Sequence, residues 1–371
     1  MKYYLIAGEA SGDLHGSLLM QALSARDPQA EFRFRGGDAM AAVSGTRVQE
    51  FRDTAVMGIV EVLAKAGSLG RNLASCKRDI LAWSPDAVIL IDYPGFNLKI
   101  ASFAHEAGFK VFYYIAPKVW ATRERRVEKL RRYVDKLFVI FPFEVEWFRA
   151  RGIEPVYEGN PLAEFVDKSL AIAPSREEFL RFNNLEDKPL LALLPGSRLQ
   201  EIRWLAPRFA ALTTDPRLEE FQFVIAGAPG ISPDTYADYL PGTPVVSGQT
   251  YSLLKHASAA AVASGTASLE TAIIGTPQVV CYGTNPLTYR IAKAFLKVKY
   301  VSLVNLIAGK PVVRELLQRG CTPAAIADEL LSLTGDDNRR SRMFAEYTLL
   351  RRSLGDTGSA GRIAAELFDS I

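Results

Sequence analysis

The chain of 371 residues is poor in the side chains that bind metals or form disulfides. Its three cysteines, Cys76, Cys281 and Cys321, are odd in number and far apart, so neither a disulfide framework nor a zinc knuckle is predicted. With only three histidines and no helical His-Glu-x-x-His pattern, the sequence offers no obvious metal ligands. We therefore expect no metal, no cofactor and free thiols in a reducing compartment.

Long apolar runs and long polar runs are also missing. No stretch of roughly eighteen uncharged apolar residues occurs, so no membrane-spanning helix is predicted. Met1-Lys2 leads directly into a strand-like segment without the pattern of a secretory signal. Because 49% of the residues are hydrophobic and 23% are charged, the composition is that of a globular rather than a disordered chain. These features predict a cytoplasmic protein.

The charge balance is nearly even, and a net charge of +3 is too small to indicate a nucleic-acid partner. Basic residues are nevertheless concentrated between Lys118 and Lys136, where eight basic side chains stand against three acidic ones. A solvated helix face, an anionic substrate or an anionic membrane surface would each account for this segment. The sequence leaves these alternatives open.

The first half of the chain alternates short apolar runs with amphipathic stretches. The runs that predict strands are residues 2–7, 31–35, 87–91, 111–115 and 136–141. Helical patterns lie between them, at 18–25, 97–107 and 127–133. This β-α-β order predicts a parallel, doubly wound sheet.

The second half repeats this alternation, with strands predicted at 189–194, 221–226, 259–263 and 278–282 and a helix at 323–333. Strand signals are absent for about two dozen residues after 159–161, which places a hinge there. A chain of this length exceeds what one core usually organises. We therefore expect an α/β protein of two Rossmann-like domains, each a doubly wound parallel sheet, facing one cleft.

Polar side chains crowd the loop after the first strand. Glu9, Ser11, Asp13 and His15 follow one another at the carboxyl end of that strand, where open α/β sheets bind ligands. The glycines of this loop lack the spacing of a dinucleotide fingerprint, so the nucleotide signal is weak. Ser11 or Asp13 could equally cap the next helix.

A single carboxylate stands where another buried strand is predicted to end. Asp92 closes the run 87–91 and precedes a turn that contains Pro94. A partly desolvated carboxylate at this place could accept a proton from a sugar hydroxyl as a general base. A helix cap or a turn aspartate is the alternative.

The second half contains a similar strand-to-loop transition at Pro195-Gly-Ser-Arg198. Ser197 and the following helix start offer hydrogen-bond donors, and Arg198 can bind a diphosphate with two parallel bonds. Pairing of Arg198 with Glu201 across a surface turn is the alternative.

A second anion loop is predicted after the strand 259–263. The backbone N–H groups of Ser264, Gly265 and Thr266 would open a helix toward a phosphate. Glu270 lies one turn further along and could reach a ribose diol.

Seven motifs together resemble those of the lipid-A-disaccharide synthase family, and they cover nearly the whole chain. They are Gly8-Glu-Ala-Ser-Gly-Asp-Leu-His-Gly16, Ile91-Asp-Tyr-Pro-Gly-Phe-Asn97, Tyr-Tyr-Ile-Ala-Pro-Lys-Val-Trp at 113–120, Phe141-Pro-Phe-Glu144, Leu194-Pro-Gly-Ser-Arg198, Ala263-Ser-Gly-Thr-Ala-Ser-Leu-Glu270 and Tyr300-Val-Ser-Leu-Val-Asn305.

The resemblance implies a glycosyltransferase of the B-type fold (GT-B). Residues 1–167 with 347–371 would form the acceptor-side domain, and 168–346 would bind the UDP-sugar. UDP-2,3-diacylglucosamine would donate its sugar to 2,3-diacylglucosamine 1-phosphate, giving a β-1,6 disaccharide and UDP. Because the donor is α-linked and the product β-linked, the reaction would be inverting and would need one base and no metal.

The resemblance also assigns roles to residues. Asp92 would be the base, with His15 as a second catalytic candidate. The remaining expected substrate contacts are Glu9, Ser11, Asp13, Asn97, Ser197, Arg198, Ser264, Gly265, Thr266, Glu270, Asn305 and Gln318.

Acylated substrates imply contact with the inner-membrane surface, as a peripheral protein. Segments 56–69 and 291–300 are the candidates, with core packing as the alternative. Exchange of the last helices in a homodimer is a further expectation. A UDP-N-acetylglucosamine 2-epimerase or a non-catalytic nucleotide-sugar-binding protein would share the fold, because fold alone does not fix the reaction.

Overall fold

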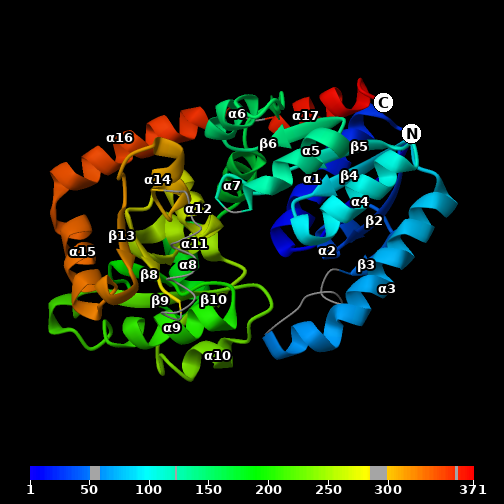
Figure 1. Cartoon of the computed structure of the whole chain (residues 1–371). Helices are drawn as coiled ribbons and strands as arrows, with labels where there is room; N and C mark the ends of the chain where they lie inside the picture. Colours follow the sequence, from blue (N-terminus) through cyan, green and yellow to red (C-terminus); the bar gives the residue numbers. More distant parts are fainter. Residues whose placement is uncertain (51–58, 122, 285–298, 356–357) are drawn as a thin grey trace. The chain divides into compact units, whose positions relative to one another are not determined.

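The computed structural model of the chain describes residues 1–371 except 51–58, 122, 285–298 and 356–357, and it leaves the side chains of 59–68 undescribed. The chain forms two compact units, Met1–Pro161 with Leu354–Ile371, and Leu162–Ser353 (Figure 1). Each unit is built on one parallel sheet with helices between its strands. The expected α/β class is confirmed for both units.

The sheet of the first unit has the order β3-β2-β1-β4-β5-β6-β7. Its strands are β1 (Lys2–Ala7), β2 (Glu31–Gly36), β3 (Arg47–Glu50), β4 (Ala87–Ile91), β5 (Lys110–Tyr114), β6 (Lys136–Val139) and β7 (Val156–Tyr157). Its helices are α1 (Ala10–Arg26), α2 (Asp38–Ala41), α3 (Ile59–Trp83), α4 (Pro94–Glu106), η2 (Glu124–Arg126), α5 (Val127–Tyr133), α6 (Pro142–Arg149) and α17 (Ser359–Phe368).

Alternation along the strands builds the core of this unit. All five residues of β4 are buried, which explains its continuous apolar run in the sequence. Val88 and Leu90 share one face, because successive side chains of a strand point to opposite sides. On that face they belong to one core cluster with Ile80 of α3, Ile100 of α4 and Leu130 of α5.

The second unit repeats the topology, with the order β10-β9-β8-β11-β12-β13. Its strands are β8 (Leu190–Leu194), β9 (Gln222–Gly227), β10 (Val245–Ser247), β11 (Ala257–Ala263), β12 (Gln278–Tyr282) and β13 (Arg314–Leu317). Its helices are α7 (Pro161–Ala171), α8 (Arg176–Phe182), α9 (Leu199–Ala210), η3 (Pro216–Leu218), α10 (Pro233–Ala237), α11 (Thr250–His256), α12 (Thr266–Ile274), α14 (Leu303–Ala308), η4 (Gln318–Gly320), α15 (Pro323–Gly335) and α16 (Asp337–Ser353).

The chain passes between the units after residues 161 and 353, whereas the sequence suggested 167 and 346. The reason is that α7 and α16 continue unbroken through the suggested boundaries. Arg351 of α16 pairs with Asp167 of α7, and the buried hydroxyl of Tyr347 accepts a 3.2 Å hydrogen bond from Gln278 Nε2. These contacts hold both helices in the second unit.

The last helix lies in the first unit beside α1. Arg26 at the end of α1 pairs with Asp369 at 2.7 Å, and Arg362 of α17 pairs with Glu158 at 3.0 Å.

Membrane-related features are only partly described. Among the described residues, no helix has the length and hydropathy needed to cross a bilayer. The segments 56–69 and 291–300, expected to meet a membrane, lie almost entirely outside the residues whose side chains are described.

Cys76, Cys281 and Cys321 are all free and buried.

Candidate functional site

Each sheet has a point where its strand order reverses, and ligands of doubly wound sheets bind at the carboxyl ends of the strands there. In the first unit this point lies between β1 and β4, which pair in parallel with Ala7 opposite Ile91. Asp92 follows β4 directly, and Glu9 lies two residues after the end of β1. The topology therefore brings two of the predicted site residues to one edge.

The backbone of Asp92 is held in an uncommon conformation. Asp92 (φ 43°) and Tyr93 (φ 48°) are both left-handed, which is unfavourable for residues other than glycine. The carbonyl of Asp92 accepts hydrogen bonds from the Tyr113 hydroxyl at 2.7 Å and from Asn97 Nδ2 at 2.9 Å. These two bonds stabilise the turn that orients the Asp92 side chain.

The carboxyl of Asp92 is half-buried at the start of α4. Burial raises its pKa above the ordinary value for aspartate, and the nearby charge of Glu9 raises it further, whereas Lys118 acts in the opposite direction. A carboxylate that is partly removed from water is a stronger base than one on the surface. Asp92 thus has the environment expected of a general base.

The loop after β1 turns at once into a helix, since α1 begins at Ala10. Glycine is required at its first position, because a Cβ on Gly8 would lie 2.2 Å from the ring of Tyr93. Glu9 and Ser11 are exposed at the start of this helix, and His15 is buried.

Asp13 is committed to bonds within the protein. Its carboxylate accepts backbone N–H bonds from Gly37 at 2.6 Å, Ala39 at 2.9 Å and Met40 at 3.2 Å, which caps the short helix α2. A substrate contact by Asp13 therefore stays a prediction, with capping as its observed role.

His15 is buried in α1, and burial lowers the pKa of its imidazole to about 4. The ring is therefore neutral near pH 7. It meets the ring of Tyr114 edge-on at 6.3 Å, and its Nδ1 has no hydrogen-bond partner among the described residues. Catalysis by His15 remains a prediction.

Asn97 is completely buried at the start of α4. Besides the carbonyl of Asp92, its Nδ2 faces the carbonyls of Ile6 at 3.3 Å and Ile91 at 3.2 Å. Asn97 thus joins the ends of β1 and β4, and the observed contacts make it a support of Asp92.

A buried carboxylate organises the neighbouring segment after β5. Glu144 accepts hydrogen bonds from Trp120 Nε1 at 2.8 Å and from the N–H groups of Ile140 and Phe141 at 3.1 and 3.0 Å. Lys118, two residues before Trp120, is exposed. Glu144 therefore anchors the segment that carries Lys118.

In the second unit the strand order reverses between β8 and β11, which pair with Leu194 opposite Val262. The carboxylate of Glu201 closes the loop after β8. It accepts hydrogen bonds from the N–H groups of Ser197 at 3.1 Å and Arg198 at 3.3 Å. A Cβ on Gly196 (φ 109°) would lie 2.4 Å from this carboxylate. The backbone N–H groups of Ser197 and Arg198 are therefore occupied.

Arg198 keeps its side chain in solvent. Its side chain is 71% exposed, and its nearest contact with Glu201 is a long one of 3.9 Å. The ion pair between Arg198 and Glu201 is therefore weak. The hydroxyl of Ser197 and the guanidinium of Arg198 are the groups this loop can offer to an anion.

The loop after β11 leads into a helix as expected, but the N–H of Ser264, expected to face a phosphate, is bound within the protein. Helix α12 begins at Thr266, and the first N–H groups of a helix lack intrahelical acceptors. Ser264 is fixed by its N–H, which donates to the Cys281 carbonyl at 3.0 Å, and by its hydroxyl, which donates to the Val301 carbonyl at 3.1 Å. Gly265 and Thr266 are exposed.

Glu270 lies one turn into α12 and is half-buried. Its carboxylate accepts a 2.8 Å hydrogen bond from the hydroxyl of Tyr251, and burial raises its pKa. Tyr251 therefore orients the residue that was expected to reach a ribose.

Asn305 and Gln318 were both expected to contact the UDP-sugar donor. Their side-chain amides instead form hydrogen bonds within the protein. Asn305 Oδ1 accepts from the N–H groups of Val312 and Val313 at 2.7 and 2.9 Å, and its Nδ2 donates to Val313 and Glu315. In its satisfied orientation the Gln318 amide exchanges bonds of 3.0 and 3.1 Å with the backbone of Thr284.

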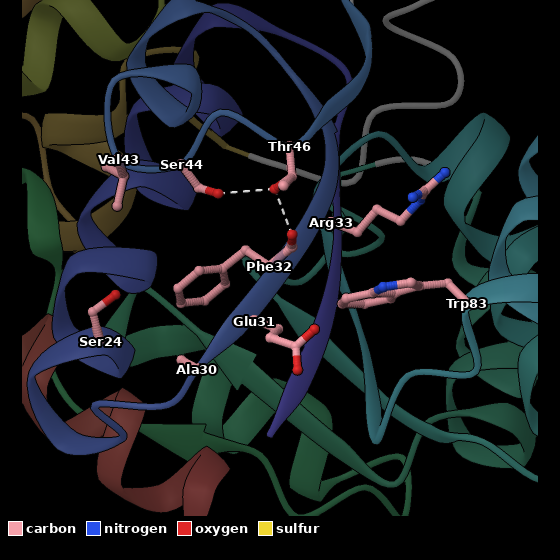
Figure 2. A pocket seen from close by; sticks show the side chains of 9 residues that line it. All are labelled: Ser24, Ala30, Glu31, Phe32, Arg33, Val43, Ser44, Thr46 and Trp83. Carbon is pink, nitrogen blue, oxygen red and sulfur yellow. Dashed lines mark hydrogen bonds between the residues drawn. The ribbon is translucent and has the colours of Figure 1, made fainter.

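A pocket of about 370 Å³ lies elsewhere, at the amino ends of the strands of the first sheet (Figure 2). The hydroxyl of Ser44 lies 2.8 Å from that of Thr46, which donates to the carbonyl of Phe32. Figure 2 draws both interactions as dashed lines. None of the predicted site residues lines this pocket.

Four supporting residues were not predicted from the sequence as site residues: Tyr113, Glu144, Tyr251 and Glu315. Tyr113 and Glu144 lie within the motifs quoted above, which was a usable signal. Nothing in the sequence around Tyr251 or Glu315 marks them.

The chain is similar to known proteins over nearly its whole length. A family model described as lipid-A-disaccharide synthetase matches residues 3–356. The chain is 37% identical over 374 residues to the lipid-A-disaccharide synthase of Trichlorobacter lovleyi, covering 99% of this chain and 97% of that protein.

Two solved structures show the fold. The UDP-GlcNAc 2-epimerase of Neisseria meningitidis bound to UDP-GlcNAc has a TM-score of 0.70 at 12% identity and full coverage of both chains. CalG4, the calicheamicin glycosyltransferase, has a TM-score of 0.60 at 17% identity, covering 99% of this chain and 97% of that one. The fold is thus the GT-B fold that glycosyltransferases and these epimerases share. The chain belongs to the lipid-A-disaccharide synthetase family and is a glycosyltransferase.

Proposed function

We propose that this protein transfers 2,3-diacylglucosamine from UDP-2,3-diacylglucosamine to the 6-hydroxyl of 2,3-diacylglucosamine 1-phosphate, with inversion and without a metal ion. The products are a β-1,6-linked disaccharide 1-phosphate and UDP. Family membership supports the reaction class, and the residues at the two points of strand reversal support the division of roles.

Asp92 of the first unit acts as the base. Its carboxylate takes the proton of the acceptor hydroxyl while that oxygen attacks the anomeric carbon of the donor. One displacement inverts the anomeric configuration and forms no covalent sugar intermediate. The half-buried carboxyl, its raised pKa and its fixed backbone carry this assignment.

The second unit receives the leaving group. As the bond from the anomeric carbon to the diphosphate breaks, the electron pair and the negative charge move onto UDP. The exposed guanidinium of Arg198 and the start of α12 at Thr266 supply positive charge and N–H donors to that diphosphate. Glu270, oriented by Tyr251, binds the ribose diol.

The test is an incubation of the protein with both diacylated substrates, followed by measurement of UDP and disaccharide. Asp92→Asn should lower turnover by about 100-fold or more while leaving UDP affinity unchanged. Asp86→Asn is the matched control, because Asp86 lies at the opposite end of β4, where it caps the N–H of Lys2. Full activity of Asp92→Asn would contradict the assignment, and chelation with EDTA should leave the rate unchanged.

Acylated substrates require access to a lipid surface, so we propose peripheral association with the inner membrane. Exposed basic side chains just before η2, within it and within α5 support this proposal, namely Arg123, Arg125, Lys129 and Arg132. Co-flotation with anionic liposomes should occur at low salt and weaken as salt rises. No co-flotation at low salt would contradict it.

A homodimer that exchanges the C-terminal helix is also proposed. The pairing of α17 with α1 through Arg26 and Asp369 is the contact that two subunits would exchange. Light scattering coupled to gel filtration would measure the mass, and a monomer at all concentrations would exclude the exchange.

A further inference from the structure

The carboxylate of Glu315 gathers several donors from one segment of the second unit. Glu315 lies on the edge strand β13, opposite Val280 of β12. Its oxygens accept from Val301 N at 3.0 Å, Ser302 N at 2.9 Å, Ser302 Oγ at 2.8 Å and Asn305 Nδ2 at 2.9 Å. One side chain thereby fixes the start of α14 and the residues before it.

The observed partners of the Glu315 carboxylate are N–H and O–H groups. Among the residues that the structure describes, no lysine or arginine forms an ion pair with Glu315. Glu329, a buried glutamate of α15, behaves differently, because it pairs with Arg314 at 3.1 Å and with Arg339. An ionised carboxylate accepts hydrogen bonds and donates none, so Glu315 suits a cluster of N–H and O–H groups.

The segment held by Glu315 reaches the phosphate cradle through one hydrogen bond. Val301 donates its N–H to Glu315 and accepts the hydroxyl of Ser264 at its carbonyl, at 3.1 Å. The N–H of Ser264 is bound at the end of β12, by the Cys281 carbonyl. Ser264 is therefore placed from two sides, and Glu315 controls one of them.

We propose that Glu315 is a positioning residue for the sugar-nucleotide donor: through Val301 it sets Ser264 and the exposed start of α12 for the diphosphate. This inference rests on the proposed function, in which that helix start receives the diphosphate of UDP. Glu315 touches no substrate in this scheme and acts only through the segment that it holds.

The first experiment compares UDP binding by calorimetry for the full chain and for Glu315→Gln. The glutamine keeps the shape of the side chain but points an N–H₂ group at donors, so the segment must shift. We expect the Kd for UDP to rise about tenfold. An unchanged Kd would overturn the inference.

The matched control separates positioning from general stability. Glu329→Gln removes a buried carboxylate from the same unit without touching the segment 301–305. It should lower Tm and leave the Kd for UDP unchanged. Equal weakening of UDP binding in both variants at an equal loss of Tm would overturn the inference.

Two further variants cover the case in which Glu315→Gln does not fold. Ser302→Ala deletes the hydroxyl bond to Glu315 together with the hydroxyl cap on the N–H of Asn305, and should raise the Kd for UDP about threefold. Ser264→Ala cuts the link to Val301, so adding Ser302→Ala to it should have little further effect. Fully additive effects would overturn the inference, whereas a wild-type chain that fails to bind UDP would overturn the proposed function and this inference with it.

Discussion

The hydroxyl of Tyr113 lies 2.7 Å from the main-chain carbonyl of Asp92 and donates a hydrogen bond to it. Tyr113 belongs to β5 and Asp92 follows β4, so the bond ties two neighbouring strand ends at the edge where the base is proposed to act. It also satisfies a carbonyl that the left-handed turn removes from the sheet. A contact of this kind supports catalysis without touching the substrate.

Removing that hydroxyl should affect the rate more than binding. In Tyr113→Phe the carbonyl of Asp92 loses this bond and keeps, among the described side chains, the one from Asn97, so its carboxylate is less well placed. We expect kcat to fall about tenfold, stability to fall by about 1 kcal/mol and UDP affinity to stay unchanged. Tyr133→Phe, on α5, is the control, and equal losses of rate in both variants would contradict the role of Tyr113.

Lys118 should tune the pH dependence of the reaction. Three titratable side chains affect or face Asp92, namely Lys118, Glu9 and Tyr113. Of these, Lys118 lowers the pKa of Asp92, as does a hydrogen bond from the backbone of Tyr93. Protonation of Asp92 abolishes the base, so the rate falls as the pH drops through its pKa. Lys118→Met should therefore move the acidic limb of kcat/KM to higher pH.

The control for this shift is Lys129→Met, an exposed lysine of the same basic segment that does not act on Asp92. Its profile should coincide with that of the wild type, and Lys118→Arg should restore the wild-type limb. A limb that moves equally in the Lys118→Met and Lys129→Met variants would reveal a general charge effect instead.

The strands show clearly where sequence reasoning succeeds. The central strands were predicted to within one or two residues because burial on both faces gives a continuous apolar run, as in β4 and β8. The four strands that it missed, β3, β7, β10 and β13, are the edge strands of the two sheets. They are short, and most of their residues are only partly buried, so their sequences resemble loops.

The site residues fall into two similar groups: those that a local sequence pattern predicts, and those whose roles depend on distant partners. Asp92, Arg198 and Ser264 were placed at strand ends because a strand followed by a polar turn is a local pattern. Asp13, Asn97 and Asn305 have the same chemistry, but their partners come from other parts of the chain. Whether an amide or carboxylate faces a ligand or a distant backbone group depends on packing, which a local pattern does not contain.

Asn305 gives a direct test of that difference. Its amide makes four hydrogen bonds to the segment 312–315, so Asn305→Ala leaves several buried groups unpaired. We expect stability to fall by about 3 kcal/mol, which lowers Tm by several degrees. Thermal unfolding measures this loss, and an unchanged Tm with lost UDP binding would instead identify Asn305 as a donor contact.

Glu144 should make the stability of the first unit depend on pH. Its carboxyl is 1% exposed, and burial raises its pKa from 4.5 to about 7, although Trp120 and Lys118 oppose that rise. The folded state therefore holds this proton more tightly than the unfolded state. Stability contributed by the proton is present at low pH and is lost as the pH rises from about 4.5 to 7, by at most about 3 kcal/mol.

Replacing Glu144 by glutamine removes the titration. Between pH 5 and 7.5 the unfolding free energy of Glu144→Gln, measured with urea, should fall less than that of the wild type. Tyr157, the other titratable group that Glu144 affects, stays protonated in this range because its pKa is raised to about 12. Glu128→Gln, on the exposed face of α5, serves as the control and should keep the wild-type slope. If the unfolding free energy of Glu144→Gln changes with pH as steeply as that of the wild type, the carboxyl of Glu144 is already ionised throughout this range. Its hydrogen bond with Trp120 then does not depend on pH.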